Sequence, residues 1–214
     1  MKRLKVPTIN VLDVLDITSI GSLLEEKAQR EYISHANWRE YPYKPITVFD
    51  IVRSKQNLYI RYTVQGYSFE KRLMRWTNSS VHKDSCVEFF MKKEGDSHYM
   101  NFEFNCIGTC DAARRTSRDI KTSLSQDEYK SIQRLPSLKR QSFAEKKGIY
   151  SWSLIVVIPF KLMGLDPENL PEKILGNFYK CADDTEYPHF VSWSPIDLPE
   201  PNFHCPEFFG EIYL

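Results

Sequence analysis

Two glutamates, Glu88 and Glu103, lie inside aromatic-rich runs of the stretch DSCVEFFMKKEGDSHYMNFEFN, which covers residues 84–105. The runs are typical of β-strands, and the polar, glycine-containing KKEGDSH between them predicts a hairpin connection. Because side chains alternate between the faces of a strand, antiparallel pairing would create one apolar face and one polar face. The polar face would carry Glu88, Tyr99, Asn101, Glu103 and Asn105. It is either ordinary solvated sheet surface or the floor of a polar site.

A pair of carboxylates on neighbouring strands suits three kinds of chemistry. Glycosidases use two such groups roughly 5–10 Å apart, and facing strands bring side chains within that range. Carboxylates also bind calcium. They also accept hydrogen bonds from adjacent sugar hydroxyls, while aromatic rings cover the apolar C–H face of the sugar. The spacing of Glu88 and Glu103 alone leaves all three open.

Motifs of other catalytic classes are absent from the sequence: the GxSxG nucleophile, the glycine-rich phosphate loop and the HExxH zinc motif. The five scattered cysteines predict free thiols, with a local Cys106–Cys110 disulfide as the alternative. A haem site ligated by Met74 or Met100 is a further alternative, although methionines more often fill cores. Four separate histidines are interpreted as surface or capping residues: His82, His98, His189 and His204.

The composition indicates a globular protein of ordinary polarity. Its 214 residues suit one domain, predicted over 1–214, and a 14% share of aromatic residues favours β-structure or stacking surfaces. Lys plus Arg is 29 and Asp plus Glu is 28, so the net charge of +1 gives no reason to expect nucleic acid as a partner.

Two further expectations concern membranes and location. No apolar run approaches the roughly 18 residues of a membrane span, so no membrane insertion is expected. The first residues are a poor signal peptide, which favours a cytoplasmic location. A periplasmic or extracellular location is expected instead if an export signal lies outside this chain.

Strand-like runs recur along the chain with little helix between them. Residues 111–147 differ, because ten Lys and Arg stand against five Asp and Glu. They predict a basic, loop-rich insertion that is either solvated or placed to meet an anionic ligand. The dominance of strands predicts an all-β sandwich. Strands are expected at 46–52, 57–64, 86–91, 99–106, 152–160, 176–182, 189–196 and 211–214, and a short helix at 22–30.

Several segments together carry a resemblance to a known family: DSCVEFF, NFEFN, WSLIVVIP, GNFYKCADDT, SWSP and NFHCPEFFGEIYL. Over residues 46–214 the chain resembles the family 9 carbohydrate-binding modules, and especially their stand-alone relatives in Bacteroides-like bacteria. The resemblance implies a jelly-roll-like β-sandwich with short helices. It also implies a non-catalytic protein of polysaccharide utilisation, related to modules that accompany xylanases, bind sugar chain ends and contain calcium.

The resemblance also implies site residues. The sugar-contacting glutamate of the family falls on Glu88, and its Arg-x-Asn strand falls on Glu103 and Asn105, with the arginine replaced. Of the two tryptophans that clamp the sugar, one falls on Phe203 and the other on Val81. His82 and Trp76 are the nearest substitutes for the second ring. Trp193, in SWSP, matches a tryptophan that we interpret as structural and keep among the candidates.

The sequence therefore predicts non-catalytic carbohydrate binding, to sugar chain ends or small saccharides, on a polar sheet face flanked by aromatics. The alternative is a glycoside-processing enzyme that uses Glu88 and Glu103 as its carboxylate pair. Two facing carboxylates repel unless a cation lies between them or one is protonated. We therefore expect this pair either to share a cation, for which the resemblance implies calcium, or to recognise a different sugar. The candidate binding residues are Glu88, Glu103, Asn105, Phe203, Trp76, His82 and Trp193.

Overall fold

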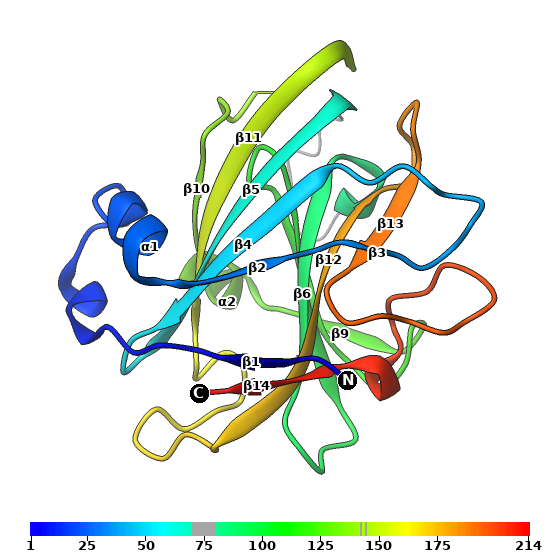
Figure 1. Cartoon of the computed structure of the whole chain (residues 1–214). Coiled ribbons are helices and arrows are strands. Elements are labelled where there is room, and N and C mark those ends of the chain that lie inside the picture. The colour runs from blue at the N-terminus through cyan, green and yellow to red at the C-terminus, as the bar shows by residue number, and fades with distance from the viewer. Residues whose placement is uncertain (70–79, 142, 144) are drawn as a thin grey trace.

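The computed structural model describes residues 1–69, 80–141, 143 and 145–214. Two β-sheets packed face to face make up most of the molecule (Figure 1). The strands of the larger sheet are β1 (Arg3–Lys5), β3 (His35–Ala36), β6 (Cys86–Lys92), β7 (Tyr99–Asn105), β8 (Cys110–Arg115), β9 (Lys121–Ser123), β12 (Lys173–Ala182), β13 (His189–Ser192) and β14 (Gly210–Tyr213). In the described part of the chain their order is β1-β14-β12-β6-β7-β8-β9, with β13 beside β12 and β3 beside β13.

The smaller sheet has the order β10-β11-β5-β4-β2. Its strands are β2 (Gln29–Tyr32), β4 (Ile46–Arg53), β5 (Asn57–Phe69), β10 (Gln133–Pro136) and β11 (Lys146–Pro159). Helical segments are short: α1 (Gly21–Lys27), α2 (Gln126–Ser131) and the 3-10 turns η1 (Asn10–Val14), η2 (Val81–Lys83) and η3 (Pro206–Phe208). None of the described helices has the length and apolar character of a membrane span. The prediction of an all-β sandwich with short helices is confirmed.

The main core lies between the two sheets. Phe49 on β4 stacks on Phe178 of β12, with 3.9 Å between the ring centroids, and Phe178 stacks in turn on Phe89 of β6 at 4.8 Å. Val87 and Met91, two residues to either side of Phe89, join the same core. The apolar face predicted for the 84–105 hairpin is therefore the face that holds the sheets together.

The outer face of the larger sheet is also covered. The chain between β13 and β14 packs over it and builds a second apolar cluster with Phe90, Tyr179, Phe203 and Phe209. The hairpin forms with the antiparallel pairing expected, and its connection contains Gly95 at a φ of 85°. Glu88 and Glu103 on its outer face are only 2% and 4% exposed. The alternative of a solvated sheet surface is therefore wrong.

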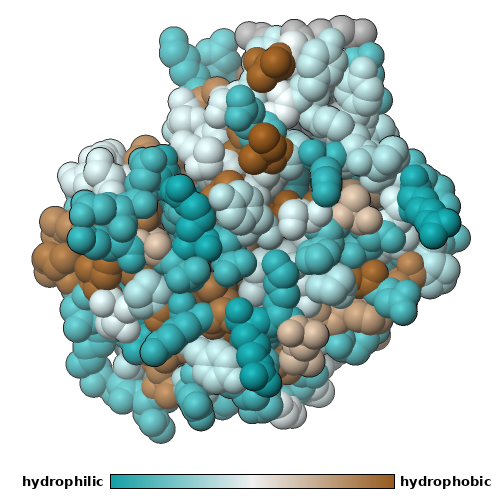
Figure 2. Space-filling model, viewed as in Figure 1, coloured by the Kyte–Doolittle hydropathy of each residue, from teal (hydrophilic) through white to brown (hydrophobic). Residues whose placement is uncertain are grey.

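The outer face of the smaller sheet is covered by residues 9–28. Leu12 of η1 and Leu24 of α1 pack with Val52 and Val157 of the sheet. Helix α1 ends three residues before the predicted end, because β2 begins at Gln29 and pairs with β4. On the face seen in Figure 2, apolar residues are scattered among hydrophilic ones, as is usual for a protein surface.

The basic segment 111–147 is not the loop-rich insertion that was predicted. It contains most of β8, all of β9, α2 and β10, and the first residues of β11. Its strands are short, and the charged Arg114 and Arg115 concealed the pattern of strand β8. Helix α2 begins at Ser125 with a capping box, in which the Ser125 side chain accepts from the Glu128 amide and Glu128 accepts from the Ser125 amide. The sequence SQDE carries this signal.

The aromatic stack predicts where stability is concentrated. Phe178→Ala removes the ring between Phe49 and Phe89 and is expected to lower the free energy of unfolding by about 3–5 kcal/mol. Chemical denaturation measures the loss. Ile149→Thr is the control, because Ile149 is 75% exposed and its change is expected to stay within about 0.5 kcal/mol. Equal losses in the two variants would contradict the placement of the core.

Candidate ligand pocket

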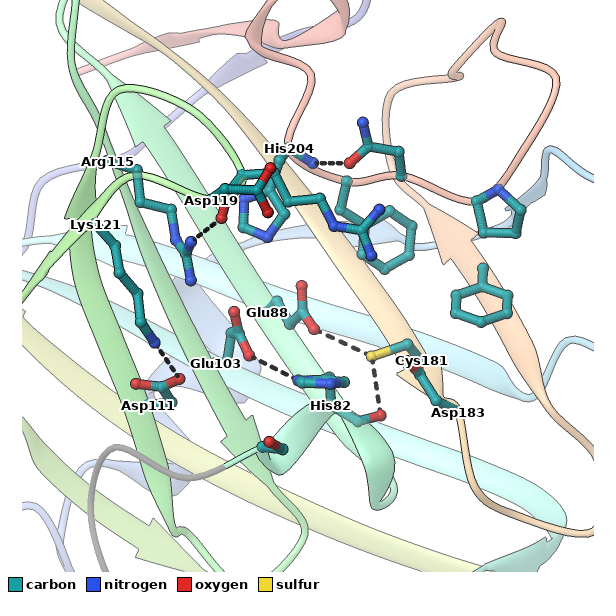
Figure 3. Close-up of a pocket in the computed structure, with 16 residues that line it drawn as sticks. His82, Glu88, Glu103, Asp111, Arg115, Asp119, Lys121, Cys181, Asp183 and His204 are labelled. Atoms are coloured by element: carbon teal, nitrogen blue, oxygen red, sulfur yellow. Dashed lines mark hydrogen bonds and ion pairs between the residues drawn. The ribbon is translucent and has the colours of Figure 1, made fainter.

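A pocket of about 350 Å³ opens on the outer face of the larger sheet. Strands β6, β7, β8 and β12 supply its floor. The turn between β8 and β9 supplies one wall, and the chain at 201–204 supplies the other (Figure 3). The volume falls in the usual range for small-molecule sites, about 300–1,000 Å³.

Three acidic side chains form a row across the floor. In the β-sheet register Glu88 of β6 lies opposite Glu103 of β7, and Glu103 lies opposite Asp111 of β8. All three are buried and line the pocket. Cross-strand neighbours have Cβ atoms about 4.5–5.5 Å apart, so the charges of this row interact strongly. Asp111 was missed from the sequence because it lies in the segment predicted to be a loop.

Burial and repulsion shift the pKa values of Glu88 and Asp111. Burial raises the pKa of Glu88 well above its ordinary value, and the charge of Glu103 raises it further. Burial likewise raises the pKa of Asp111, followed by the effect of Glu103, while Lys121 lowers it. Lys121 Nζ lies 3.7 Å from Asp111 Oδ2. The floor therefore holds both a carboxyl group that favours its neutral form and a carboxylate paired with a cation.

Glu103 is held from two sides. Its Oε1 accepts a hydrogen bond of 2.9 Å from the Asn101 side chain, and Asn101 Oδ1 accepts one of 2.7 Å from Arg115 Nε. His82 Nδ1 lies 3.6 Å from Glu103 Oε2, which is too long for a hydrogen bond but close enough for an ion pair. This attraction raises the pKa of His82, against the effect of burial. Asn101, on the predicted polar face, therefore positions Glu103 without lining the pocket.

The β8–β9 turn brings cations to the rim. Arg115, Arg118 and Lys121 line the pocket, and the Arg115 guanidinium donates to the main-chain oxygen of Arg118. The basic segment was expected either to be solvated or to meet an anionic ligand. These three of its residues are placed to contact a ligand in the pocket. Acidic groups on the floor and cations on the rim give the pocket a mixed charge.

The opposite wall is aromatic. Phe203 stacks on Tyr179 with 4.1 Å between centroids and 9° between planes, so one face of its ring is covered. Tyr179 also donates its hydroxyl to the main-chain oxygen of Phe203. Phe190 meets Phe203 edge-on and lines the pocket with it. The wall is thus rigid and presents part of an aromatic surface.

Four of the seven predicted residues lie together in the pocket: Glu88, Glu103, His82 and Phe203. Asn105 does not line it, because its amide donates to Asp84 and its oxygen accepts from the amides of Ile107 and Thr109. Trp76 lies outside the described residues. Val81 is fully buried in the apolar cluster of the outer face, so no aromatic ring stands at that position.

Trp193 lies in the main core, away from the pocket. Its ring meets Phe49 and Phe178 edge-on, and its Nε1 donates to Glu31. A Cβ on Gly210 would come within 2.5 Å of the Trp193 ring, so only glycine fits there. This position agrees with the interpretation of Trp193 as a structural residue. It does not agree with the prediction that Trp193 contacts the sugar.

Of the remaining histidines, His98 is exposed as predicted, whereas His189 and His204 differ from the prediction. His204 lines the pocket and its Nδ1 lies 2.9 Å from the Tyr99 hydroxyl, while His189 is buried beside Lys180. Neither is a surface residue. Met100 packs in the main core, which is the commoner role of methionine.

One cluster of donor atoms at the floor contains two thiols and does not suit calcium. Within the part of the chain that the structure describes, one group of three potential ligands has its ligand atoms within 4.8 Å of one another: Cys86, Glu88 and Cys181. Calcium takes about six to eight oxygen ligands, and two of these three donors are thiols. This group does not test the calcium ion expected between Glu88 and Glu103, which stays a prediction. All five cysteines are free and buried, so Cys106 and Cys110 form no disulfide in this structure.

Comparisons with known proteins agree on one family. The model of carbohydrate-binding family 9 matches residues 19–214. A crystal structure of a candidate carbohydrate-binding protein from Bacteroides uniformis ATCC 8492 is 34% identical, covers 99% of this chain and 98% of its own, and has a TM-score of 0.92. None of the curated proteins that were compared matches the chain.

Two solved structures with bound sugar share the fold. A family 9 module from Caldicellulosiruptor kristjanssonii in complex with glucose has a TM-score of 0.59 at 13% identity, over 99% of this chain and 95% of its own. The same kind of module in complex with cellotriose has a TM-score of 0.58 at 14% identity, over 99% and 93%. These two likenesses confirm the β-sandwich.

The pocket predicts an unusual titration for His204. Burial, followed by the charges of Arg115 and Arg118, lowers the pKa of His204 from 6.5 to about 3. The unfolded chain therefore takes up this proton below pH 6.5 and the folded protein does not until about pH 3, so His204 reduces stability as pH falls across that interval. An NMR titration should show constant His204 ring signals between pH 7 and about 4, with assignment from the His204→Gln spectrum. A midpoint near the ordinary value would refute the buried, neutral imidazole.

Proposed function

The chain belongs to carbohydrate-binding family 9, and from that premise we propose that it binds sugar chain ends or small saccharides in the pocket on β6, β7 and β12. Carbohydrate binding without catalysis is the function of this protein that the sequence and the comparisons support together. We further propose a role in polysaccharide utilisation beside glycoside-degrading enzymes such as xylanases, supported by the resemblance in sequence.

The observation that carries the proposal is a buried carboxyl pair beside an aromatic wall. Glu88 and Glu103 lie on the floor, and Phe203 lies across the same pocket. Adjacent hydroxyls of a sugar ring are hydrogen-bond donors that match two neighbouring carboxyl groups. The C–H face of the same ring is apolar and packs on an aromatic side chain. A pocket with both features suits a sugar better than a wholly apolar ligand.

The aromatic wall predicts weak binding. The described residues that line the pocket include Phe203 and Phe190, which stand near each other on one side. Val81 is buried in the apolar cluster and supplies no ring opposite them. A sugar is therefore stacked from one side, and we expect dissociation constants between about 1 mM and 1 μM, or about −4 to −8 kcal/mol.

The cations at the rim of the pocket suggest which sugars to test. Arg118 and Lys121 line the pocket beside the acidic row. A neutral sugar can donate to the carboxyl groups, and a uronic sugar can in addition place its carboxylate on the cations. Glucose, cello-oligosaccharides, xylo-oligosaccharides and uronic sugars are therefore the ligands to compare first.

Three substitutions test whether the sugar binds in this pocket. Their affinities are measured by calorimetry on chelator-treated protein, with the sugar that the unaltered protein binds most tightly. Glu88→Ala and Glu103→Gln each remove a hydrogen bond to a charged or buried group and should weaken binding at least tenfold. Phe203→Ala removes a stacking ring worth about 1–3 kcal/mol by analogy with base stacking, which is about 5-fold to 150-fold.

Tyr32→Ala is the matched control, because Tyr32 is an exposed aromatic on the smaller sheet. It should bind like the unaltered protein. Circular dichroism confirms that each variant is folded before its affinity is compared. Unchanged affinity in all three pocket variants would place the sugar elsewhere.

The competing function, a glycosidase that uses Glu88 and Glu103, has its own test. A glycosidase needs its two carboxyl groups on either side of the scissile bond. Here they are direct neighbours on the floor, and Glu88 Oε1 accepts from Cys181 Sγ at 3.1 Å. Chromogenic glycosides should therefore show no turnover above the rate without protein. Turnover that is lost in Glu103→Gln would establish an enzyme instead.

A further inference from the structure

Two thiols and a carboxyl group meet at the floor of the pocket. Cys86 of β6 lies directly opposite Cys181 of β12, and Glu88 follows two residues after Cys86 on the same face. Cys181 Sγ is 3.1 Å from Glu88 Oε1, and Cys86 Sγ is 3.8 Å from the same oxygen. Figure 3 shows Cys181 beside Glu88, with its sulfur pointing toward that carboxyl group.

From this geometry we propose that Cys86, Glu88 and Cys181 bind a thiophilic divalent cation of the Zn²⁺ class. Nothing in the family resemblance assigns this site. Zn–S bonds of about 2.3 Å and Zn–O bonds of about 2.1 Å at tetrahedral angles place neighbouring ligand atoms roughly 3.4–3.8 Å apart. The two sulfur–oxygen separations are 3.1 and 3.8 Å, and all three ligand atoms lie within 4.8 Å of one another. The ion therefore needs only small movements of side chains.

The identity of the donors selects the class of ion. Thiolate ligands favour Zn²⁺ and other soft or borderline cations, whereas calcium and magnesium prefer oxygen alone. Apart from Glu88, the two sulfurs have each other and the weakly contacting main-chain oxygens of Val87 and His82 as hydrogen-bond partners. Binding replaces the two S–H donors by sulfur–metal bonds and releases to solvent the two thiol protons and the proton of the neutral Glu88 carboxyl group.

The fourth position of such an ion faces the pocket. Glu88 and Cys181 both line it, so an ion can enter from solvent without opening the core. Across the floor, Glu103 Oε2 is buried and has no hydrogen-bond partner. Apart from the ion pair with His82 Nδ1 at 3.6 Å, this oxygen is available to a bound cation or a ligand donor in this part of the pocket. A site with three protein ligands and an open fourth position has the ligand number of catalytic zinc sites, whereas structural zinc sites have four protein ligands.

Cobalt titration tests the site directly. The whole protein is treated with a chelator, reduced with a phosphine and titrated with Co²⁺, which reports thiolate coordination by a near-ultraviolet charge-transfer absorption. We expect one equivalent to bind with that absorption, and added Zn²⁺ to abolish it. Added Ca²⁺ at the same concentration should leave it unchanged.

Variants identify the ligands. Cys86→Ser and Cys181→Ser should each weaken Co²⁺ binding at least 100-fold, and Glu88→Gln at least tenfold. Cys205→Ser is the matched control, because Cys205 is also a buried free thiol but donates to the main-chain oxygen of Asn202, which a hydroxyl can do equally well. It should bind Co²⁺ as the unaltered protein does.

Three results would overturn the proposal: no binding by the fully reduced protein, an absorption that survives in the doubly substituted Cys86→Ser, Cys181→Ser protein, or displacement of Co²⁺ by Ca²⁺. The cobalt titration is done without saccharide, so its result does not depend on sugar binding. Saccharide affinity is measured on chelator-treated protein, so failure of metal binding leaves the proposed function untouched.

Discussion

Two carboxyl groups face each other on neighbouring strands of a sheet that is covered on both sides, and the arrangement of the pocket follows from the need to accommodate their charge. Glu88 and Glu103 are almost fully buried and directly opposite in register. A buried carboxylate without a partner is strongly unfavourable, and two of them close together are worse. The surrounding residues resolve this in different ways for the two groups. Glu103 has Asn101 and His82, while Glu88 has two thiol donors and a raised pKa.

This arrangement depends on the cover over the outer face of the larger sheet. The chain between β13 and β14 carries Phe203, which stacks on Tyr179 and so fixes that wall of the pocket next to β12. Asn101 and Arg115 connect the floor to the β8–β9 edge through two hydrogen bonds in series. The pocket is thus lined by side chains whose positions are determined by core packing on one side and by a polar network on the other. Such a site is largely formed before a ligand arrives, which favours selectivity over the ability to adapt.

The parts of the site that are local in sequence were predictable, and the parts that depend on long-range pairing were not. Period-two alternation within 84–105 placed Glu88 and Glu103 on one face, and the glycine turn set them opposite each other. The same pattern could not show whether that face was wet, because the covering chain lies about a hundred residues away. Cys181 joined the site through the pairing of β6 with β12, which spacing cannot reveal. Asp111 and Arg115 were missed because the charged residues of β8 and of the segment that follows it resemble a loop. The family resemblance supplied Phe203 and the sugar, but it also suggested Asn105, which instead holds the turn after β7.

The central claim is that saccharides bind over the acidic row beside Phe203. Its most direct test is an NMR titration of isotope-labelled, chelator-treated protein with glucose and cello- and xylo-oligosaccharides, following backbone amide signals. The account predicts saturable changes at Glu88, Glu103 and residues 201–204, with little change on the smaller sheet. Saturable changes confined to another face, or none at millimolar concentrations of any of these sugars, would contradict it.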